Sequence, residues 1–220
     1  QLDLTTINDT HEVELEFTST KDVCKYVSII RGIISKVSRK GRVIAQYRNL
    51  TNTNRFVGPL PKTLTKNDFS RQMSKTKYAV TDKADGERFL YFIDNDGNIE
   101  FISRNMDIGL SNLPNKRAYR NTLIDGELVG DTFYSFDLLF VKGKDVRKEK
   151  LSNRLNRLSG IVNDLNIKIK KFYFDDIYKN SKMIWDSKRN FPYSLDGLIY
   201  TPIDLEYNNP KILKWKDENT

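Results

Sequence analysis

The sequence predicts an α+β fold in which strands outnumber helices. Short apolar runs that alternate with polar residues, or are bounded by turn residues, recur along most of the chain, as is typical of strands. The segment Asp94-Asn95-Asp96-Gly97-Asn98 separates two such runs and is typical of a β-hairpin turn. Apolar residues at helical spacing occur in only a few segments, namely residues 21–37, 152–165 and 175–189.

Composition narrows the class of protein. The 220 residues suffice for one domain or one and a half, and an apolar fraction of 38% is that of a globular protein. No apolar run of roughly 18 residues or more and no signal peptide is visible, so we expect no membrane span. The single cysteine, Cys24, excludes an internal disulfide and fits a reducing compartment. The net charge of +8 suits a polyanion such as RNA, although lysine-rich surfaces also serve solubility alone.

The N-terminal segment carries an acidic strand. Residues 11–17 alternate strictly, so Glu12, Glu14 and Glu16 share one face. This face is either a solvated acidic surface or a row of carboxylates for a divalent cation, which would relieve the repulsion between like charges. The chain begins with Gln1 and not with methionine, so we expect it to be a piece of a longer polypeptide.

A helix and a linker follow the acidic strand. The apolar stripe of residues 21–37 predicts a helix that ends before Gly41. Residues 48–62 are polar and contain Gly58-Pro59 and Pro61, which predicts a linker. We therefore expect two parts, residues 1–60 and residues 61–220.

The stretch Lys83-Ala84-Asp85-Gly86-Glu87-Arg88 is the leading candidate for chemistry. It lies between two apolar runs, residues 78–81 and 89–93, that are expected to be strands. Lysine is a nucleophile only as the free amine, and its ordinary pKa of about 10.4 must be depressed by neighbouring cations or desolvation. The alternative is a surface hairpin turn.

Three later segments place polar groups on apolar strands. Asp125 and Glu127 share one face of the run at residues 123–129, and a buried strand rarely carries two carboxylates without partners. Asp196-Gly197 opens the apolar run that ends at Tyr200. Alternation puts Lys214 and Lys216 on one face and Trp215 on the other, so the two lysines can hold a phosphate.

The remaining C-terminal segments are expected to be scaffold. These are an aromatic strand at residues 133–140, the helix at 152–165, a strand at 167–174 and the helix at 175–189. We expect no chemistry from residues 152–189.

These segments, in this order, resemble the motifs of the covalent nucleotidyltransferases, which are mRNA capping guanylyltransferases and polynucleotide ligases. The resemblance covers residues 11–17 and about 64–216. It implies the nucleotidyltransferase α+β fold, in which mostly antiparallel sheets flanked by helices hold the nucleotide between them. The OB-fold domain of the family is expected to be absent from this chain, which should impair its activity.

The resemblance also implies roles for individual residues. Lys83 is the covalent nucleophile, Arg88 contacts the ribose, and Phe136 stacks on the purine. Mg²⁺ or Mn²⁺ binds Glu127 and Asp196. The remaining nucleotide-binding residues are Asp85, Arg104, Lys214 and Lys216.

Three features favour capping over ligation: Asp196 where ligases usually have glutamate, the sequence Leu-Lys-Trp-Lys at 213–216, and the acidic strand, which resembles the last acidic strand of tunnel-type RNA triphosphatases. The likeness is greatest to the multifunctional capping enzymes of large cytoplasmic DNA viruses. It implies GTP as substrate, a lysyl-GMP intermediate, and GMP transfer to the 5′-diphosphate end of RNA in the cytoplasm, in a viral factory or virion. Implied partners in the same polypeptide are a triphosphatase part, an OB domain and possibly a methyltransferase. The alternatives are the adenylation domain of an ATP-dependent ligase and a non-catalytic RNA-binding scaffold.

Overall fold

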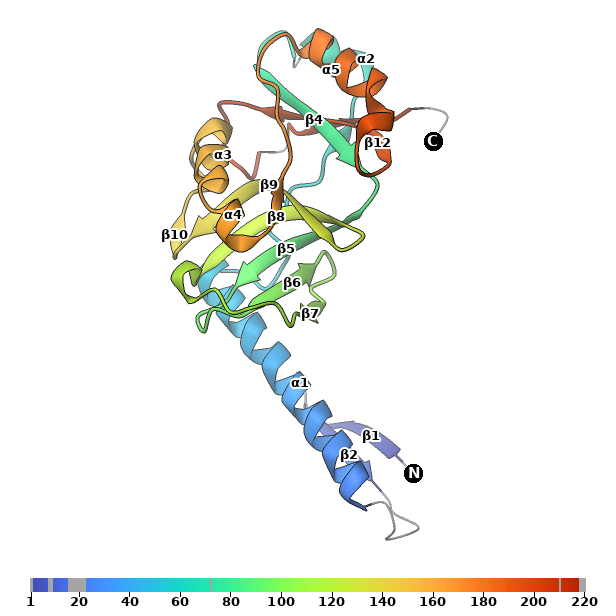
Figure 1. Ribbon diagram of the computed structural model, residues 1–220, viewed down its shortest axis with the longest axis vertical. Helices are drawn as coiled ribbons and strands as arrows, with labels where there is room; N and C mark the ends of the chain where they lie inside the picture. The colour runs from blue at the N-terminus through green and yellow to red at the C-terminus, as the bar shows by residue number, and fades with distance from the viewer. Residues whose placement is uncertain (1, 8–9, 16–22, 72, 210, 218–220) are drawn as a thin grey trace. The chain divides into compact units, whose positions relative to one another are not determined.

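The computed structural model describes residues 2–7, 10–15, 23–71, 73–209 and 211–217, and it forms two compact units, residues 1–42 and 43–220 (Figure 1). The boundary lies earlier than the one expected after residue 60. The reason is that the long helix α1 (Val23–Thr51) continues into the second unit, where Val43 and Tyr47 are fully buried beside Leu90. No helix of the described residues is long and apolar enough to cross a membrane.

The first unit contains a β-hairpin and the beginning of α1. Strands β1 (Leu2–Ile7) and β2 (Thr10–Leu15) pair antiparallel, with Glu14 opposite Asp3 and Glu12 opposite Thr5. The predicted acidic strand is thus present over Thr10–Leu15, while Glu16 lies outside the described residues. The structure describes only the backbone of this hairpin, so the cation-binding interpretation stays a prediction.

Helix α1 is 29 residues long, and the prediction that it ends before Gly41 is wrong. A glycine inside a helix costs only about 1 kcal/mol relative to alanine. Burial of Val43 and Tyr47 in the second unit more than offsets that cost, since each buried large apolar side chain contributes about 1.5–3 kcal/mol. The helix ends where Asn52 adopts a left-handed conformation with a φ of 59°, and its N–H donates to the Arg48 carbonyl at 2.8 Å.

A seven-stranded sheet forms the larger layer of the second unit, in the order β10-β9-β8-β5-β6-β7, with β11 also pairing with β9. All its pairs are antiparallel except that of β11 with β9, as the mostly antiparallel expectation requires. The predicted hairpin joins β5 to β6. The strands are β5 (Glu87–Ile93), β6 (Ile99–Ser103), β7 (Ile108–Leu110), β8 (Thr122–Val129), β9 (Thr132–Val141), β10 (Lys144–Asp145) and β11 (Lys168–Ile169).

A four-stranded sheet forms the second layer, in the order β3-β13-β12-β4. Helix α5 (Ile177–Asp186) packs on it through the buried Ile184, and the short helix α2 (Lys66–Arg71) lies at the same end of the unit (Figure 1). The strands are β3 (Lys62–Thr63), β4 (Tyr78–Ala84), β12 (Leu195–Pro202) and β13 (Leu213–Trp215).

Two expected scaffold elements differ from the prediction. The helix expected at 152–165 is two helices, α3 (Leu151–Ser159) and α4 (Val162–Leu165), separated at Gly160. The strand expected at 167–174 is only β11, followed by a single bridge from Tyr173 to Val80 of β4. This segment therefore runs from the seven-stranded sheet to the four-stranded sheet. The single-turn helices η2 (Arg117–Tyr119) and η3 (Lys188–Asn190) complete the fold.

Alternation along the central strands gives the seven-stranded sheet two apolar faces. In β5, Tyr91 and Ile93 join the cluster covered by α3 and α4, whereas Leu90 and Phe92 join the cluster that holds the end of α1. Both faces of this sheet are thus covered, and a cavity lies between it and the four-stranded sheet.

Candidate active site

The lysine stretch crosses from one sheet to the other. Lys83 lies in β4 opposite Gly197 of β12, whereas Arg88 lies in β5 opposite Glu127 of β8. Asp85, which lies between them, is exposed, and its N–H donates to the Ser194 carbonyl at 3.0 Å. The two flanking strands belong to different sheets, so the alternative of a surface hairpin turn is wrong.

A cavity of about 1050 Å³ lies between the two sheets. Its volume is close to the upper range of small-molecule sites, about 300–1000 Å³. Asp85 is not among its lining residues. Asp196 does not line it either, but contacts two lysines that do. The sequence-predicted residues in its lining are Lys83, Arg88, Arg104, Glu127, Phe136, Lys214 and Lys216.

Two lysines share one carboxylate at the end of this cavity. Asp196 Oδ2 accepts from Lys83 Nζ and lies 2.7 Å from Lys216 Nζ. Partial burial raises the pKa of the Asp196 carboxyl, but the hydrogen bonds from Lys216 and Lys83 lower it more, so that its pKa lies below the usual value. The carboxylate is therefore ionised at neutral pH and holds Lys83 in a fixed position.

The β13 strand presents its lysines as alternation predicts. Lys214 and Lys216 line the cavity, whereas Trp215 points into the apolar cluster of the four-stranded sheet. The Trp215 ring meets the Trp185 ring of α5 edge-on at 4.9 Å between centroids. This packing fixes the strand that carries the two lysines.

A buried lysine links the two sheets beneath the cavity. Lys170 Nζ lies 2.9 Å from Glu127 Oε2 and 3.2 Å from Asp82 Oδ2, and its side chain is only 2% exposed. The Tyr193 hydroxyl donates to the same Asp82 oxygen at 2.9 Å. An ammonium can be buried only when it is paired, and here two carboxylates supply the pairing.

Lys170 lines the cavity although it lies within residues 152–189, from which no chemistry is expected. Alternation in Lys168-Ile169-Lys170 places both lysines on the same face, yet Lys168 is exposed and Lys170 is buried. Only the tertiary contact with Glu127 distinguishes them, and the sequence carries no signal for that contact.

Asp125 and the Pro59 carbonyl hold the Arg88 guanidinium in place. Its Nε and Nη2 atoms lie 3.0 and 2.6 Å from the two oxygens of Asp125, and Nη1 donates to the Pro59 carbonyl at 2.7 Å. Its guanidinium carbon lies 5.4 Å from the ring centroid of Phe56 and 5.5 Å from that of Phe136. Burial lowers the pKa of Arg88, but the charge and hydrogen bonds of Asp125, together with the smaller effect of Tyr207, raise that pKa above its ordinary value.

The predicted metal ligands offer carboxylate oxygens beside the cavity. The described residues contain no group of three or more histidine, cysteine, aspartate or glutamate side chains that could hold a metal ion. Mg²⁺ is, however, commonly bound by one or two carboxylates together with substrate phosphates. Glu127 lines the cavity, and Asp196 contacts two lysines that line it, so both carboxylates lie where they could share an ion with substrate phosphates.

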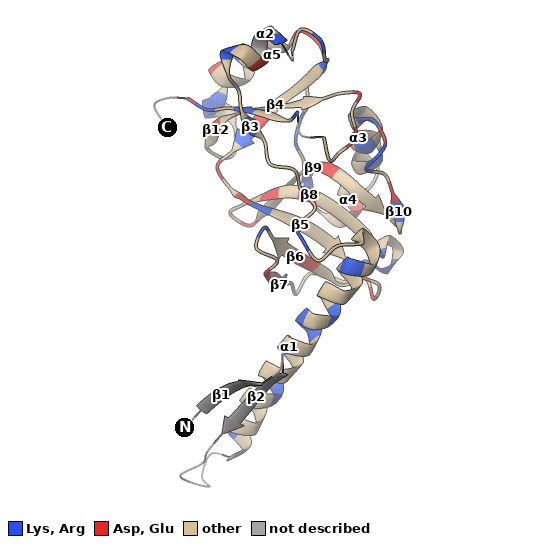
Figure 2. Cartoon of the chain, turned by 180° about the vertical axis from the view of Figure 1, so that it is seen from behind, with Lys and Arg blue, Asp and Glu red and all other residues tan. Residues whose placement is uncertain are grey.

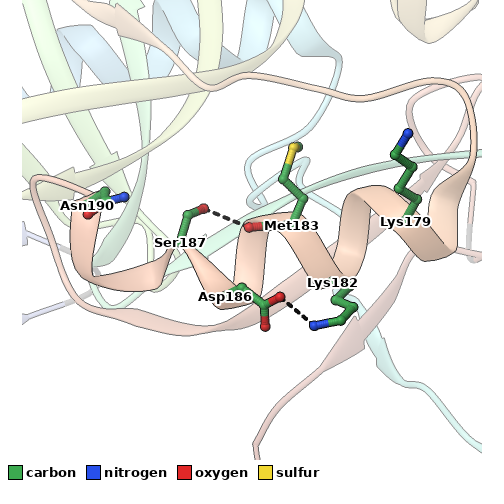
Figure 3. Close-up of a pocket in the computed structure, with 6 residues that line it drawn as sticks. All are labelled: Lys179, Lys182, Met183, Asp186, Ser187 and Asn190. Atoms are coloured by element: carbon green, nitrogen blue, oxygen red, sulfur yellow. Dashed lines mark hydrogen bonds and ion pairs between the residues drawn. The ribbon is translucent and has the colours of Figure 1, made fainter.

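A second hollow of about 480 Å³ lies on the surface of α5 (Figure 3). Lys182 pairs there with Asp186, and the Ser187 hydroxyl donates to the Met183 carbonyl at 2.7 Å. These groups satisfy one another within the helix, and none of the sequence-predicted site residues lines this hollow. Basic and acidic positions are interspersed over both sheets, whereas α1 carries basic positions and no acidic ones (Figure 2).

The chain was matched by one family and by several known proteins. The family described as mRNA capping enzyme, catalytic domain, matches residues 23–218. A probable mRNA-capping enzyme of Acanthamoeba polyphaga mimivirus is 27% identical over 93% of this chain and 24% of that protein. The mRNA-capping enzyme of African swine fever virus (strain Badajoz 1971 Vero-adapted) is 28% identical over 72% of this chain and 19% of that protein. The chain thus spans a quarter or less of the length of these relatives.

Solved structures show the fold. A mycobacterial DNA ligase D complexed with ATP and MES has a TM-score of 0.56 at 17% identity, covering 72% of this chain and 60% of that one. The ligase domain of M. tuberculosis LigD has a TM-score of 0.54 at 18% identity, covering 72% and 59%. These likenesses confirm the predicted α+β nucleotidyltransferase fold.

Proposed function

This chain belongs to the mRNA capping enzyme family, and from that premise we propose that it is the part of an mRNA guanylyltransferase that forms a covalent lysyl-GMP intermediate. The observation that carries the proposal is the common cavity of Lys83, Phe136, Lys214 and Lys216. A purine on Phe136 and phosphates beside the lysines would bring the α-phosphate near Lys83.

The reaction has two steps. The Lys83 amine attacks the α-phosphorus of GTP, loses a proton, and forms a P–N bond as the bond to the β-phosphate oxygen breaks and pyrophosphate leaves. A terminal oxygen of the RNA 5′-diphosphate then attacks the same phosphorus. The P–N bond breaks, the lysine regains a proton, and the GMP joins the RNA end.

The Asp196 salt bridge orients Lys83 before the first step. To attack, the Lys83 amine must leave this carboxylate. Since Lys216 contacts the same Asp196 oxygen, the carboxylate stays paired when Lys83 moves away. Lys214 remains available for the phosphates in the cavity.

Glu127 and Asp196 would hold the divalent ion, Mg²⁺ or Mn²⁺. When bound, such an ion neutralises charge on the phosphates as pyrophosphate leaves. Lys170 keeps Glu127 at the cavity floor, and Arg104 at the end of β6 lies at the same cavity.

The proposal extends to the polypeptide around this chain. We propose that the acidic strand of Glu12, Glu14 and Glu16 is one wall of a triphosphatase tunnel whose remainder lies elsewhere. We also propose that further domains, an OB-fold domain among them, complete the enzyme, which acts in the cytoplasm at a viral factory or in the virion. The greater length of the viral relatives supports only the presence of further sequence around this chain.

The test is covalent labelling. Incubation with α-labelled GTP and Mg²⁺ should leave label on the denatured protein, and Lys83→Ala should abolish it. The matched control is Lys182→Ala, which removes an exposed lysine on α5 outside the cavity and should leave labelling unchanged. Labelling by ATP in preference to GTP would favour the ligase alternative instead. No label with either nucleotide would favour the RNA-binding scaffold.

A further inference from the structure

Tyr207 is a buried tyrosine outside the predicted motifs. It lies between β12 and β13 and is only 2% exposed. Its N–H donates to the Arg147 carbonyl at 2.8 Å, and its ring joins the cluster of Leu90 and Phe92. Through Tyr207, the connection between β12 and β13 of the four-stranded sheet packs against β5 of the seven-stranded sheet.

The Tyr207 hydroxyl donates to Asp125 Oδ2, a carboxylate that is fully buried. The pKa of Tyr207 lies well above its ordinary value because of burial and the nearby Asp125 charge. The hydroxyl therefore keeps its proton, and Asp125 always has this donor.

Asp125 in turn sets the orientation of Arg88. One of its oxygens receives Arg88 Nε, and the oxygen that accepts from Tyr207 also receives Arg88 Nη2. A guanidinium has five N–H groups, of which Asp125 takes two and the Pro59 carbonyl a third. The Arg88 side chain is 16% exposed and lines the cavity, so its remaining N–H groups can meet a ligand there.

We propose that Tyr207 is a positioning residue for the nucleotide. By fixing Asp125 it aims Arg88 at the sugar and keeps the guanidinium beside Phe136. Tyr207 and Lys214 both line the cavity, and β13, which carries Lys214, is the next strand along the chain. This inference rests on the proposed function, because it assigns the ligand of Arg88 as a nucleoside triphosphate.

The test is Tyr207→Phe, which removes only the hydroxyl. Single-turnover adduct formation is measured against GTP concentration. We expect the half-saturating concentration to rise about tenfold, which corresponds to about 1.4 kcal/mol of binding free energy. The maximal rate should change less than threefold, because the Lys83 end of the cavity is untouched.

The matched control is Tyr200→Phe. Tyr200 is also a buried tyrosine of the four-stranded sheet, but its hydroxyl lies 3.1 Å from the Ser181 hydroxyl and away from the cavity. It should lower the melting temperature by a similar amount and leave the half-saturating GTP concentration unchanged. In an Arg88→Ala background, Tyr207→Phe should have no further effect on that concentration.

The outcomes separate the two proposals. If the wild-type chain forms no adduct, the proposed function is wrong. If it does, the inference is overturned by an unchanged half-saturating concentration in Tyr207→Phe, by an equal rise in Tyr200→Phe, or by an additive loss with Arg88→Ala. Should Tyr207→Phe not fold, Asp125→Asn replaces it. This change weakens the hydrogen bonds that Asp125 makes with Arg88, so it should also raise the half-saturating GTP concentration.

Discussion

Tyr91 carries a hydroxyl that is buried without a hydrogen-bond partner among the described residues. Its ring is packed between Phe101 and Phe133, at 5.5 and 5.4 Å between centroids. An unsatisfied buried hydroxyl costs about 1–3 kcal/mol. We expect Tyr91→Phe to keep or raise the free energy of unfolding in urea.

Tyr47→Phe is the control for that prediction. The Tyr47 hydroxyl donates to the Arg55 carbonyl at 2.8 Å, so its loss should lower stability by about 1 kcal/mol. A larger loss in Tyr91→Phe than in Tyr47→Phe would mean that the Tyr91 hydroxyl has a partner.

Arg154 and Asp137 form a buried ion pair at the wall of the cavity, with N–O distances of 2.7 and 2.9 Å. Arg154→Met would leave the buried Asp137 carboxylate without its cationic partner and lower the free energy of unfolding by about 3–5 kcal/mol at neutral pH. Burial raises the pKa of Asp137 above its usual value, Arg154 partly offsets that rise, and removing Arg154 should raise this pKa further. The folded state then binds a proton more tightly than the unfolded state, so stability falls as the pH rises through the window between the two pKa values. Denaturation of the variant should therefore show a smaller loss near pH 4 than at pH 7, and an equal loss at both would contradict the assignment.

At this scale the sequence reveals the residues that belong to local patterns. Lys214 and Lys216 alternate with Trp215 within one strand, and the resemblance in motif order predicts roles for Lys83 and Phe136, both of which line the cavity. The sequence does not reveal Lys170 and Tyr207, because their partners lie far along the chain. Glu127 is 43 residues from Lys170, and Asp125 is 82 residues from Tyr207. Such contacts exist only once the two sheets face each other.

At the scale of elements, β12 and β13 approach closely at a glycine. Gly197 has a φ of 144°, and an added Cβ would lie 1.9 Å from the Trp215 carbonyl oxygen. Gly197→Ala should therefore part the two strands and move Lys214. We expect a loss of several kcal/mol in unfolding free energy, in line with the cost of strained backbone and steric overlap, together with a loss of GTP labelling.

The matched glycine is Gly41 in α1, where an added Cβ meets nothing within 4 Å. Gly41→Ala should raise stability by about 0.5–1 kcal/mol. If both changes had the same effect on unfolding, the close approach at Gly197 would not constrain the protein.

Element boundaries were predictable where local chemistry decides them. The Asp94–Asn98 hairpin is confirmed because the Asp94 carboxylate accepts from the N–H groups of Asp96 and Asn98, a local turn interaction. The extension of α1 past Gly41 and the short β11 depend on packing against distant strands, so helix and strand patterns alone gave them wrong limits.

At the scale of the molecule, the cavity is bounded by two sheets, and the proposed function has it bind the nucleotide mainly through base, sugar and α-phosphate contacts. A domain that closes over the triphosphate would align the leaving pyrophosphate and exclude water. We expect this chain to form the Lys83 adduct at least tenfold more slowly than a longer chain that includes an OB-fold domain, since positioning terms reach several kcal/mol. Single-turnover labelling of both proteins measures the difference, and equal rates would make this chain self-sufficient.

The whole fold was predictable only through the resemblance. The pairing of β4 with β12 joins residues far apart in the sequence; Lys83 and Asp196, for example, are 113 positions apart. Alternation and turn residues can identify strands, but many sheets accommodate the same strands, and nothing local selects this pairing.

The crossing at Asp85 and Gly86 makes an exposed connection intolerant of insertion. A Cβ on Gly86 would lie 2.7 Å from the Leu128 carbonyl oxygen, so the backbone at Gly86 is in close contact with β8 where the chain crosses between the sheets. Exposed loops usually accept extra residues, whereas this one is a spacer of fixed length between Lys83 and Arg88. Homologous chains should therefore differ in length within the surface loop at 111–121, and keep the two-residue bridge at 85–86 unaltered.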